Sequence, residues 1–181
     1  MSWQLIRDVL PRSKSLLALL FLPLLGSCSY VYEILAVSID GQLAFVIDPA
    51  SRYQPDCAFG IHVTADHGEP KAEPEPGDQV GLVENGGAYW WDVKDTRSCE
   101  NLFPIIYGKR LIGPSADNLG YVKAKPLKRD VVYQVNASGD GANGGGWFKI
   151  HPDGRIENYP GDPSPQGRYE QDYPDHQDAP N

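Results

Sequence analysis

Three side chains that could bind a metal ion or activate a water molecule lie close together in the sequence. His62, Asp66 and His67 are all metal-ligand types, and Glu69 follows them. Imidazole nitrogens and carboxylate oxygens bind zinc in catalytic sites, where the metal-bound water becomes the nucleophile of a hydrolase. Residue alternation places His62 on a strand and the other two in the loop beyond it, so a site requires His151 or another side chain to converge. An envelope hydrolase or a metal-dependent enzyme that uses His62, Asp66 and His67 is therefore the alternative hypothesis for this chain.

Other kinds of chemistry lack their usual motifs in this sequence. No GxSxG turn is present to hold a serine nucleophile beside a histidine base. The glycine-rich segment 139–146 lacks the GK[ST] of a phosphate loop and runs into a strand pattern instead of a helix. We expect that segment to be a flexible hairpin loop, and we predict no cofactor and no metal.

The N-terminal segment has the anatomy of an export signal. Basic residues precede an apolar run at positions 16–25, which Pro23 interrupts, and small residues follow up to Cys28. The run has about half of the roughly 20 apolar residues that a membrane-spanning helix needs. A basic start, a short apolar stretch and small residues before the cleavage point are typical of a signal peptide, here residues 1–27.

The residues at the cleavage point carry further information. Leu25, Gly26, Ser27 and Cys28 resemble the lipobox of bacterial lipoproteins. The resemblance implies cleavage before Cys28, a diacylglyceryl group on its thiol, and commonly a third acyl chain on the new amine. Several chains hold a protein on a bilayer far better than one, at about 0.8 kcal/mol per buried methylene. Ser29 in place of aspartate favours the outer membrane, with the domain facing the periplasm. An ordinary secretory signal with a coincidental cysteine is the alternative.

Removal of the signal would make the chain more acidic. The full chain has 16 Lys and Arg against 24 Asp and Glu, a net charge of −8, and loss of residues 1–27 leaves −10. Nucleic acid is disfavoured as a partner, because binding to a phosphate backbone relies on Lys and Arg. The same charge would speed the encounter with a cationic partner.

Two cysteines remain once Cys28 is assigned to lipid. Cys57 and Cys99 form an even pair in an oxidising compartment, which indicates a disulfide. Closing a loop of about 40 residues stabilises a fold by about 3 to 4 kcal/mol in the chain-entropy model. The alternatives are two buried free thiols or a metal-binding pair, but neither cysteine lies in a CxxC motif or has a histidine at ligand spacing.

Short strand patterns separated by turn residues follow the signal. Apolar runs at 30–39 and 42–48 on either side of Asp40-Gly41 predict a β-hairpin. Period-two alternation predicts a strand at 57–64. No segment has the apolar period of a helix, and we expect further strands at 79–83, 88–93, 102–107, 121–125, 131–137, 147–151 and 155–159.

Two polar segments interrupt or end this series of strands. Segment 66–78 is rich in proline and has no apolar residue larger than alanine, so we expect a solvated loop. Segment 160–181 contains no Leu, Ile, Val, Phe, Met or Trp, and it predicts a disordered acidic tail. The expected organisation is therefore a signal peptide, one anchored domain at 28–159, and the tail.

One local pattern suggests the kind of β domain. Leu127, Tyr133, Val135 and Ala137 resemble the tyrosine corner of immunoglobulin-like and fibronectin type III sandwiches. In that family the leucine packs in the core and the tyrosine hydroxyl bonds back to the backbone at the corner. The resemblance implies an antiparallel β-sandwich. The chain departs from the family in having no cysteine before the tyrosine strand, and any antiparallel pair with an inward leucine and tyrosine is the alternative.

Adjacent aromatic residues provide a candidate binding surface. Neighbouring residues on a strand face opposite sides, so if Trp91 fills the core, Trp90 faces the other side. There it is either covered by another element or forms part of a binding surface with Tyr89, since exposed Trp and Tyr are enriched at interfaces. The leading hypothesis is an outer-membrane lipoprotein that binds an envelope protein or glycan without catalysis, as an inhibitor or immunity protein or as an envelope scaffold.

Overall fold

The computed structural model describes residues 30–66, 68–96, 98–116, 119–139 and 141–160. The expected signal peptide, the lipidation site Cys28, His67 and nearly all of the expected tail lie outside these residues. Within the described part, no helix has the length and the apolar character needed to cross a membrane.

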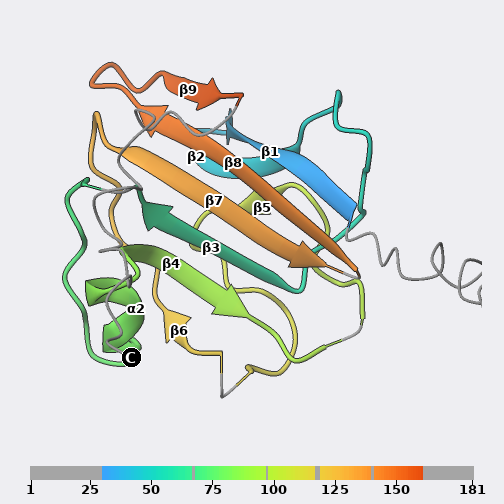
Figure 1. Cartoon of the computed structure of the whole chain (residues 1–181), viewed down its shortest axis with the longest axis horizontal. Helices are drawn as coiled ribbons and strands as arrows, with labels where there is room; N and C mark the ends of the chain where they lie inside the picture. Colours follow the sequence, from blue (N-terminus) through green and yellow to red (C-terminus); the bar gives the residue numbers. More distant parts are fainter. Residues whose placement is uncertain (1–29, 67, 97, 117–118, 140, 161–181) are drawn as a thin grey trace, which may run out of the picture.

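The described chain is built on one nine-stranded sheet with a single short helix at its side (Figure 1). The all-β class is therefore confirmed. The strand order is β5-β2-β1-β8-β7-β3-β4-β6, and β9 also pairs with β8. The elements are β1 (Tyr30–Ile39), β2 (Gln42–Ile47), β3 (Gly60–Ala65), α2 (Val80–Glu84), β4 (Ala88–Val93), β5 (Ile105–Ile106), β6 (Tyr121–Val122), β7 (Val132–Gly139), β8 (Ala142–Ile150) and β9 (Ile156–Tyr159).

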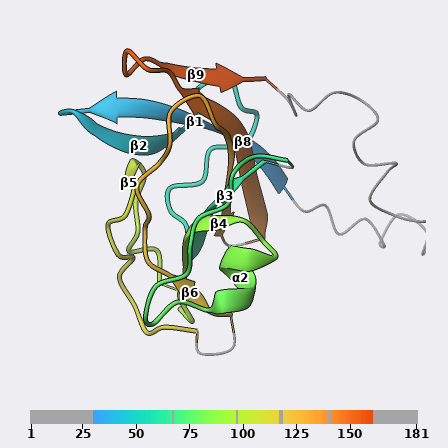
Figure 2. The same cartoon turned by 90° about the vertical axis from the view of Figure 1, so that its left-hand side faces the viewer.

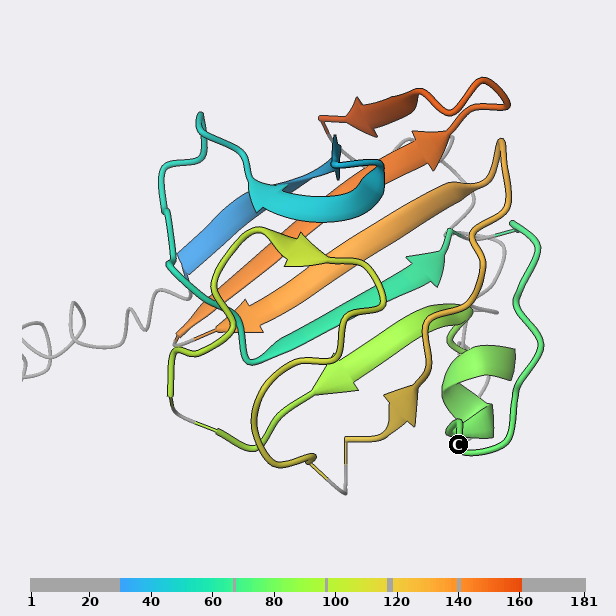
Figure 3. The ribbon, with the colours of Figure 1, turned by 180° about the vertical axis from the view of Figure 1, so that it is seen from behind.

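Strand β1 curls the sheet into a sandwich-like shape. Its first residues pair in parallel with β8, and its later residues, from Ile34 onward, pair antiparallel with β2. The sheet bends between these two pairings, so β2 and β5 lie over one face of β8, β7 and β3 (Figures 2 and 3). Phe45 of β2 packs there against Phe148 of β8, with ring centroids 5.6 Å apart. The parallel β1–β8 pair makes the sheet mixed where a purely antiparallel sandwich was expected.

The hairpin and the disulfide are both as predicted. Asp40 and Gly41 have positive φ angles of 50° and 77° and join β1 to β2, as a type I′ turn requires. Cys57 and Cys99 are bonded, with their Cα atoms 5.5 Å apart. This bond ties the segment before β3 to the loop after β4, at the end of the sheet where β1 begins.

The tyrosine corner has the hydrogen bond that the resemblance implies. The hydroxyl of Tyr133 accepts a hydrogen bond of 2.8 Å from the backbone N–H of Lys128, five residues upstream. The Tyr133 ring is fully buried, and it packs against Tyr89 and Phe148. Leu127 lies at the edge of the same core.

The glycine-rich segment 139–146 was wrongly predicted to be a hairpin loop. Strand β8 begins at Ala142, so most of the segment is sheet and the turn between β7 and β8 is short. A Cβ atom at Gly146 would collide with the carbonyl oxygen of Ile34, and one at Gly144 would collide with the ring of Tyr32. The glycines therefore allow β1 to approach β8 closely, which is a common reason for glycine inside a strand.

Three other strand predictions need correction. Segment 79–83 is mostly the one-turn helix α2, whose one buried residue, Val83, packs in a small cluster with Ala88 and Val122. A run this short is too brief for its period to separate helix from strand. In segments 102–107 and 121–125, only the two residues of β5 and the two of β6 form strands. Pro104 has no N–H for a ladder, which shortens the first of these.

Candidate functional site

The predicted binding surface at Tyr89 and Trp90 is wrong, because both side chains are only 1% exposed. Strand β3 pairs Val63 with Trp90 and Thr64 with Ala88, so Tyr89 is an extra residue without a partner. Such a β-bulge breaks the strict alternation of side chains. Tyr89 and Trp90 therefore both enter the core, and Trp91 is left on the opposite face.

His62 lies beside Trp91 on that opposite face. The two rings stack with centroids 4.1 Å apart and planes 20° from parallel. Burial lowers the pKa of His62 to about 4, so the imidazole is neutral at neutral pH. Asp66 lies beyond the end of β3, where its N–H bonds to the carbonyl oxygen of Val132.

The alternative metal site gains no support from the described residues. Among them, no group of three or more His, Cys, Asp or Glu side chains is arranged to hold a metal ion. His151, the further ligand that the sequence suggested, instead bonds through Nε2 to Glu157 at 2.7 Å. The hydrolase hypothesis stays untested, since His67 lies outside the described residues.

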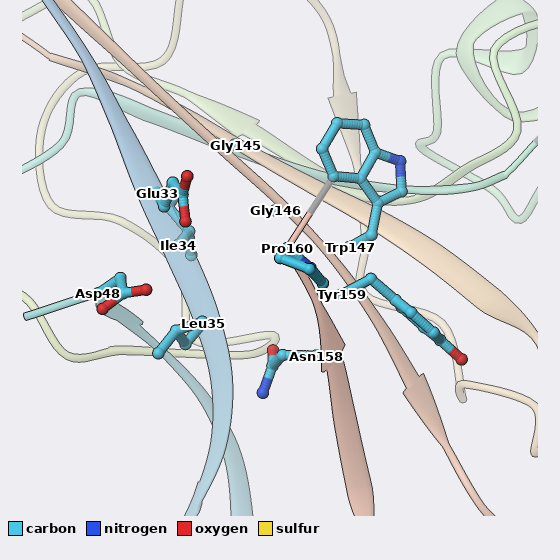
Figure 4. Close-up of a pocket in the computed structure, with 10 residues that line it drawn as sticks. All are labelled: Glu33, Ile34, Leu35, Asp48, Gly145, Gly146, Trp147, Asn158, Tyr159 and Pro160. Carbon is cyan, nitrogen blue, oxygen red and sulfur yellow. The ribbon is translucent and has the colours of Figure 1, made fainter. Parts of the chain in front are cut away.

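A pocket that the sequence did not predict lies between β1 and the β8–β9 pair (Figure 4). Strand β1 pairs with β8 only as far as Glu33. Beyond that point β9 pairs with β8 instead, starting with Tyr159 opposite Trp147. Gly145 and Gly146 of β8 line the pocket with backbone alone. The volume is about 200 Å³, and the lining residues are Glu33, Ile34, Leu35, Asp48, Gly145, Gly146, Trp147, Asn158, Tyr159 and Pro160. We call this the β1–β9 pocket.

Hydrogen bonds hold the two walls of the β1–β9 pocket in place. The amide of Asn158 accepts a 2.7 Å bond from the N–H of Ala36 and donates a 2.9 Å bond to its carbonyl oxygen, so it replaces a strand partner for β1. The N–H of Asp48 donates to the carbonyl oxygen of Glu33 at 2.9 Å. Asp48 also caps the next turn, since its Oδ1 accepts a bond from the N–H of Ala50.

The lining of the β1–β9 pocket has a one-sided chemistry. Glu33 and Asp48 are on the β1 side, and Trp147 and Tyr159 are on the β8–β9 side, with the Tyr159 ring directed away from β1 (Figure 4). The lining contains no Lys, Arg or His. Carboxylates attract cations, and the faces of aromatic rings bind them as well. The arrangement therefore suits an ammonium or guanidinium group.

Two buried ion pairs outside the pocket fasten loops to the sheet. Lys94 Nζ lies 2.7 Å from Asp92 Oδ1, and Lys125 Nζ lies 2.5 Å from Asp78 Oδ2. Burial acts to raise the pKa of Asp78, but hydrogen bonds from Lys125 and from backbone N–H groups outweigh it and keep that pKa below its usual value. Both pairs join residues that are hydrogen-bonded to distant loops, such as Leu111, which donates its N–H to Asp92 at 2.8 Å. Their role is structural.

A sequence signal existed for part of the β1–β9 pocket. Strands are expected at 147–151 and 155–159, and the observed pairing of β8 with β9 brings Trp147 opposite Tyr159. Nothing local indicates that Glu33, more than 100 residues earlier, lines the same pocket as this aromatic pair.

Comparison with known proteins adds no residue to this site. No protein-family model matches the chain, no curated protein matches it, and no solved structure matches it. The function is therefore argued from the sequence pattern and from the geometry of the described residues.

Proposed function

We propose that this protein is a lipid-anchored protein of the bacterial cell envelope that binds a partner and performs no catalysis. The anchor is Cys28, and the lipobox resemblance with Ser29 after it favours the periplasmic face of the outer membrane. The Cys57–Cys99 disulfide supports this location, because such bonds persist in oxidising compartments.

The β1–β9 pocket is the observation that carries the binding function. Its lining residues include Glu33, Asp48, Trp147 and Tyr159, and no basic residue is among them. Removal of the signal would leave a net charge of −10, which would draw in a cationic partner from a distance. The partner is a basic envelope protein that inserts a lysine or arginine side chain, as expected for an inhibitor or immunity protein.

The anchor can be tested by replacing the lipidated residue. Cys28→Ala should lose all labelling by radioactive palmitate and should move from the membrane fraction to the soluble fraction, because Cys57 and Cys99 are bonded to each other and no free thiol is left to carry acyl chains. Metabolic labelling and fractionation measure both effects. Ser29→Ala is the matched control and should keep the label. Labelling that persists in Cys28→Ala would refute the lipoprotein assignment.

The binding site can be tested by reversing one charge in its wall. Glu33 is an exposed residue of β1, so Glu33→Lys should fold normally. It should weaken retention of a basic partner by about tenfold or more, since close charge pairs at interfaces contribute about 1.5 to 7 kcal/mol. Affinity capture from detergent-solubilised envelopes, repeated over a series of salt concentrations, measures the effect.

The control for this capture experiment is Glu73→Lys. It makes the same charge change at an exposed residue in the loop before α2, which does not line the pocket. Equal loss of the partner in both variants would mean that only net charge matters. Retention of the partner by Glu33→Lys, or capture of a neutral glycan that is insensitive to salt, would contradict the proposed site.

A further inference from the structure

A second surface presents large aliphatic side chains to solvent. Leu102 is 59% exposed and Ile112 is 57% exposed. The two lie in one shallow surface pocket, together with Pro104, Ile106 and the basic residues Lys109 and Arg110. Glu100 is the one acidic residue that lines it. We call Leu102, Ile112 and Lys109 the 102–112 surface.

Hydrogen bonds and a disulfide hold the backbone of Leu102 and Ile112 in place. Asn101 is buried, and its side-chain oxygen accepts a 2.6 Å bond from the N–H of Ile112 while its amide nitrogen donates a 3.1 Å bond to the carbonyl oxygen of Ile112. The backbone of Leu102 forms an isolated antiparallel β-bridge with that of Cys57. Cys57 is also disulfide-bonded to Cys99, three residues before Leu102 in the same loop. The exposure is therefore a feature of an ordered segment that is tied to the sheet at several points.

The 102–112 surface lies at the end of the molecule where β1 begins. Phe103, next to Leu102, packs edge-on against Tyr32 of β1 with centroids 6.2 Å apart. In Figure 3 the loop after β4 runs beside the start of β1 on the same side of the molecule. Val31, the second residue of β1, is itself 72% exposed. Val31 and Leu102 thus belong to backbone segments at the same end of the sheet.

The expected lipid anchor is attached at this same end. Cys28 precedes the first residue of β1 by two positions, and two residues span at most about 7 Å. An anchor this short leaves no linker between the bilayer and the domain. The end of the sheet that carries Val31 and Leu102 must therefore lie close to the lipid headgroups.

We propose that the 102–112 surface and Val31 rest on the phospholipid surface that holds the anchor. This inference rests on the proposed anchoring at Cys28. Aliphatic side chains enter the boundary between headgroups and acyl chains, and basic side chains beside them meet lipid phosphates. Lys109 and Arg110 supply such charges at the rim in an otherwise acidic protein, and Arg110 also lies over the ring of Tyr121. The contact gives the domain one orientation on the membrane.

Photocrosslinking of the lipidated full chain in phospholipid vesicles tests the proposal. The vesicles contain a phospholipid with a diazirine near the top of its acyl chain, and crosslinked peptides are mapped by mass spectrometry. We expect crosslinks in the peptide that spans 99–112. Leu102→Ser/Ile112→Ser should reduce them by about fivefold or more, because apolar side chains drive interfacial insertion. The control is Val80→Ser, which changes an exposed aliphatic residue on α2 and should leave the crosslinks unchanged.

The outcomes separate this inference from the proposed function. Wild-type protein that is bound to vesicles through Cys28 but crosslinks only elsewhere, such as at α2 or at the 152–154 turn, would overturn the docking surface alone. Wild-type protein that carries no lipid and does not bind vesicles would overturn both. The wild-type crosslink map decides the matter even if the double variant folds poorly.

Discussion

Replacement of Lys94 by methionine is expected to lower the free energy of unfolding by about 3 to 5 kcal/mol, the usual cost of leaving a buried charge without its partner. Lys94 Nζ lies 2.7 Å from Asp92 Oδ1, and the two side chains are 1% and 2% exposed. With methionine at position 94, the Asp92 carboxylate stays in the interior and keeps the Leu111 N–H as a donor. One backbone hydrogen bond cannot replace a neutralising cation.

Urea unfolding followed by tryptophan fluorescence measures the change. The matched control is the double variant Asp92→Asn/Lys94→Met, which removes both charges and should recover most of the lost stability, because an uncharged amide is far cheaper to bury. A single Lys94→Met variant that loses less than about 1 kcal/mol would mean that water or another group compensates Asp92.

Removal of the disulfide is expected to have an effect of similar size. Cys57→Ser/Cys99→Ser opens a loop with a sequence separation of 42 residues and should lower the free energy of unfolding by about 3 to 4 kcal/mol. In the chain-entropy model most of this change comes from the unfolded state, which gains freedom when the crosslink is absent. The bond also holds the loop that carries Leu102, so the variant should expose that loop to proteolysis.

Both proteins should be compared in a Cys28→Ala background so that no third thiol takes part. Reduction of the disulfide in the parent protein should give the same unfolding midpoint as the double serine variant. A midpoint unchanged by either treatment would show that the loop is held by its other contacts, such as the bond from the N–H of Phe103 to the carbonyl oxygen of Asp56.

Local features of this fold were predictable because their causes are local. Asp40-Gly41 supplies the two positive φ angles of a type I′ turn within four residues of chain, so the hairpin of β1 and β2 follows directly. Leu127 precedes Tyr133 by six positions, and the tyrosine corner can be recognised from that spacing, since its hydrogen bond reaches only five residues upstream. The disulfide followed from a count of two remaining cysteines.

The failures have equally definite causes. Trp90 is expected on a surface only if Trp91 fills the core, and the bulge opposite Val63 and Thr64, which lets both Tyr89 and Trp90 enter the core, depends on how β3 and β4 meet. The glycines of β8 were assigned to a loop because their composition suits one. Their actual role depends on Tyr32 and Ile34, which lie more than 100 residues away in the chain.

By itself, the sequence determined the all-β class, the first hairpin, the disulfide and the expectation of a lipid anchor, since each depends on composition, cysteine chemistry or a few adjacent residues. The tertiary structure decided which aromatic rings are buried, where the β1–β9 pocket opens and which loops bring Leu102 and Ile112 to the surface. All three features depend on the point where β1 stops pairing with β8 and pairs only with β2. That change joins segments far apart in the chain, and no local sequence pattern specifies how such segments pair and pack.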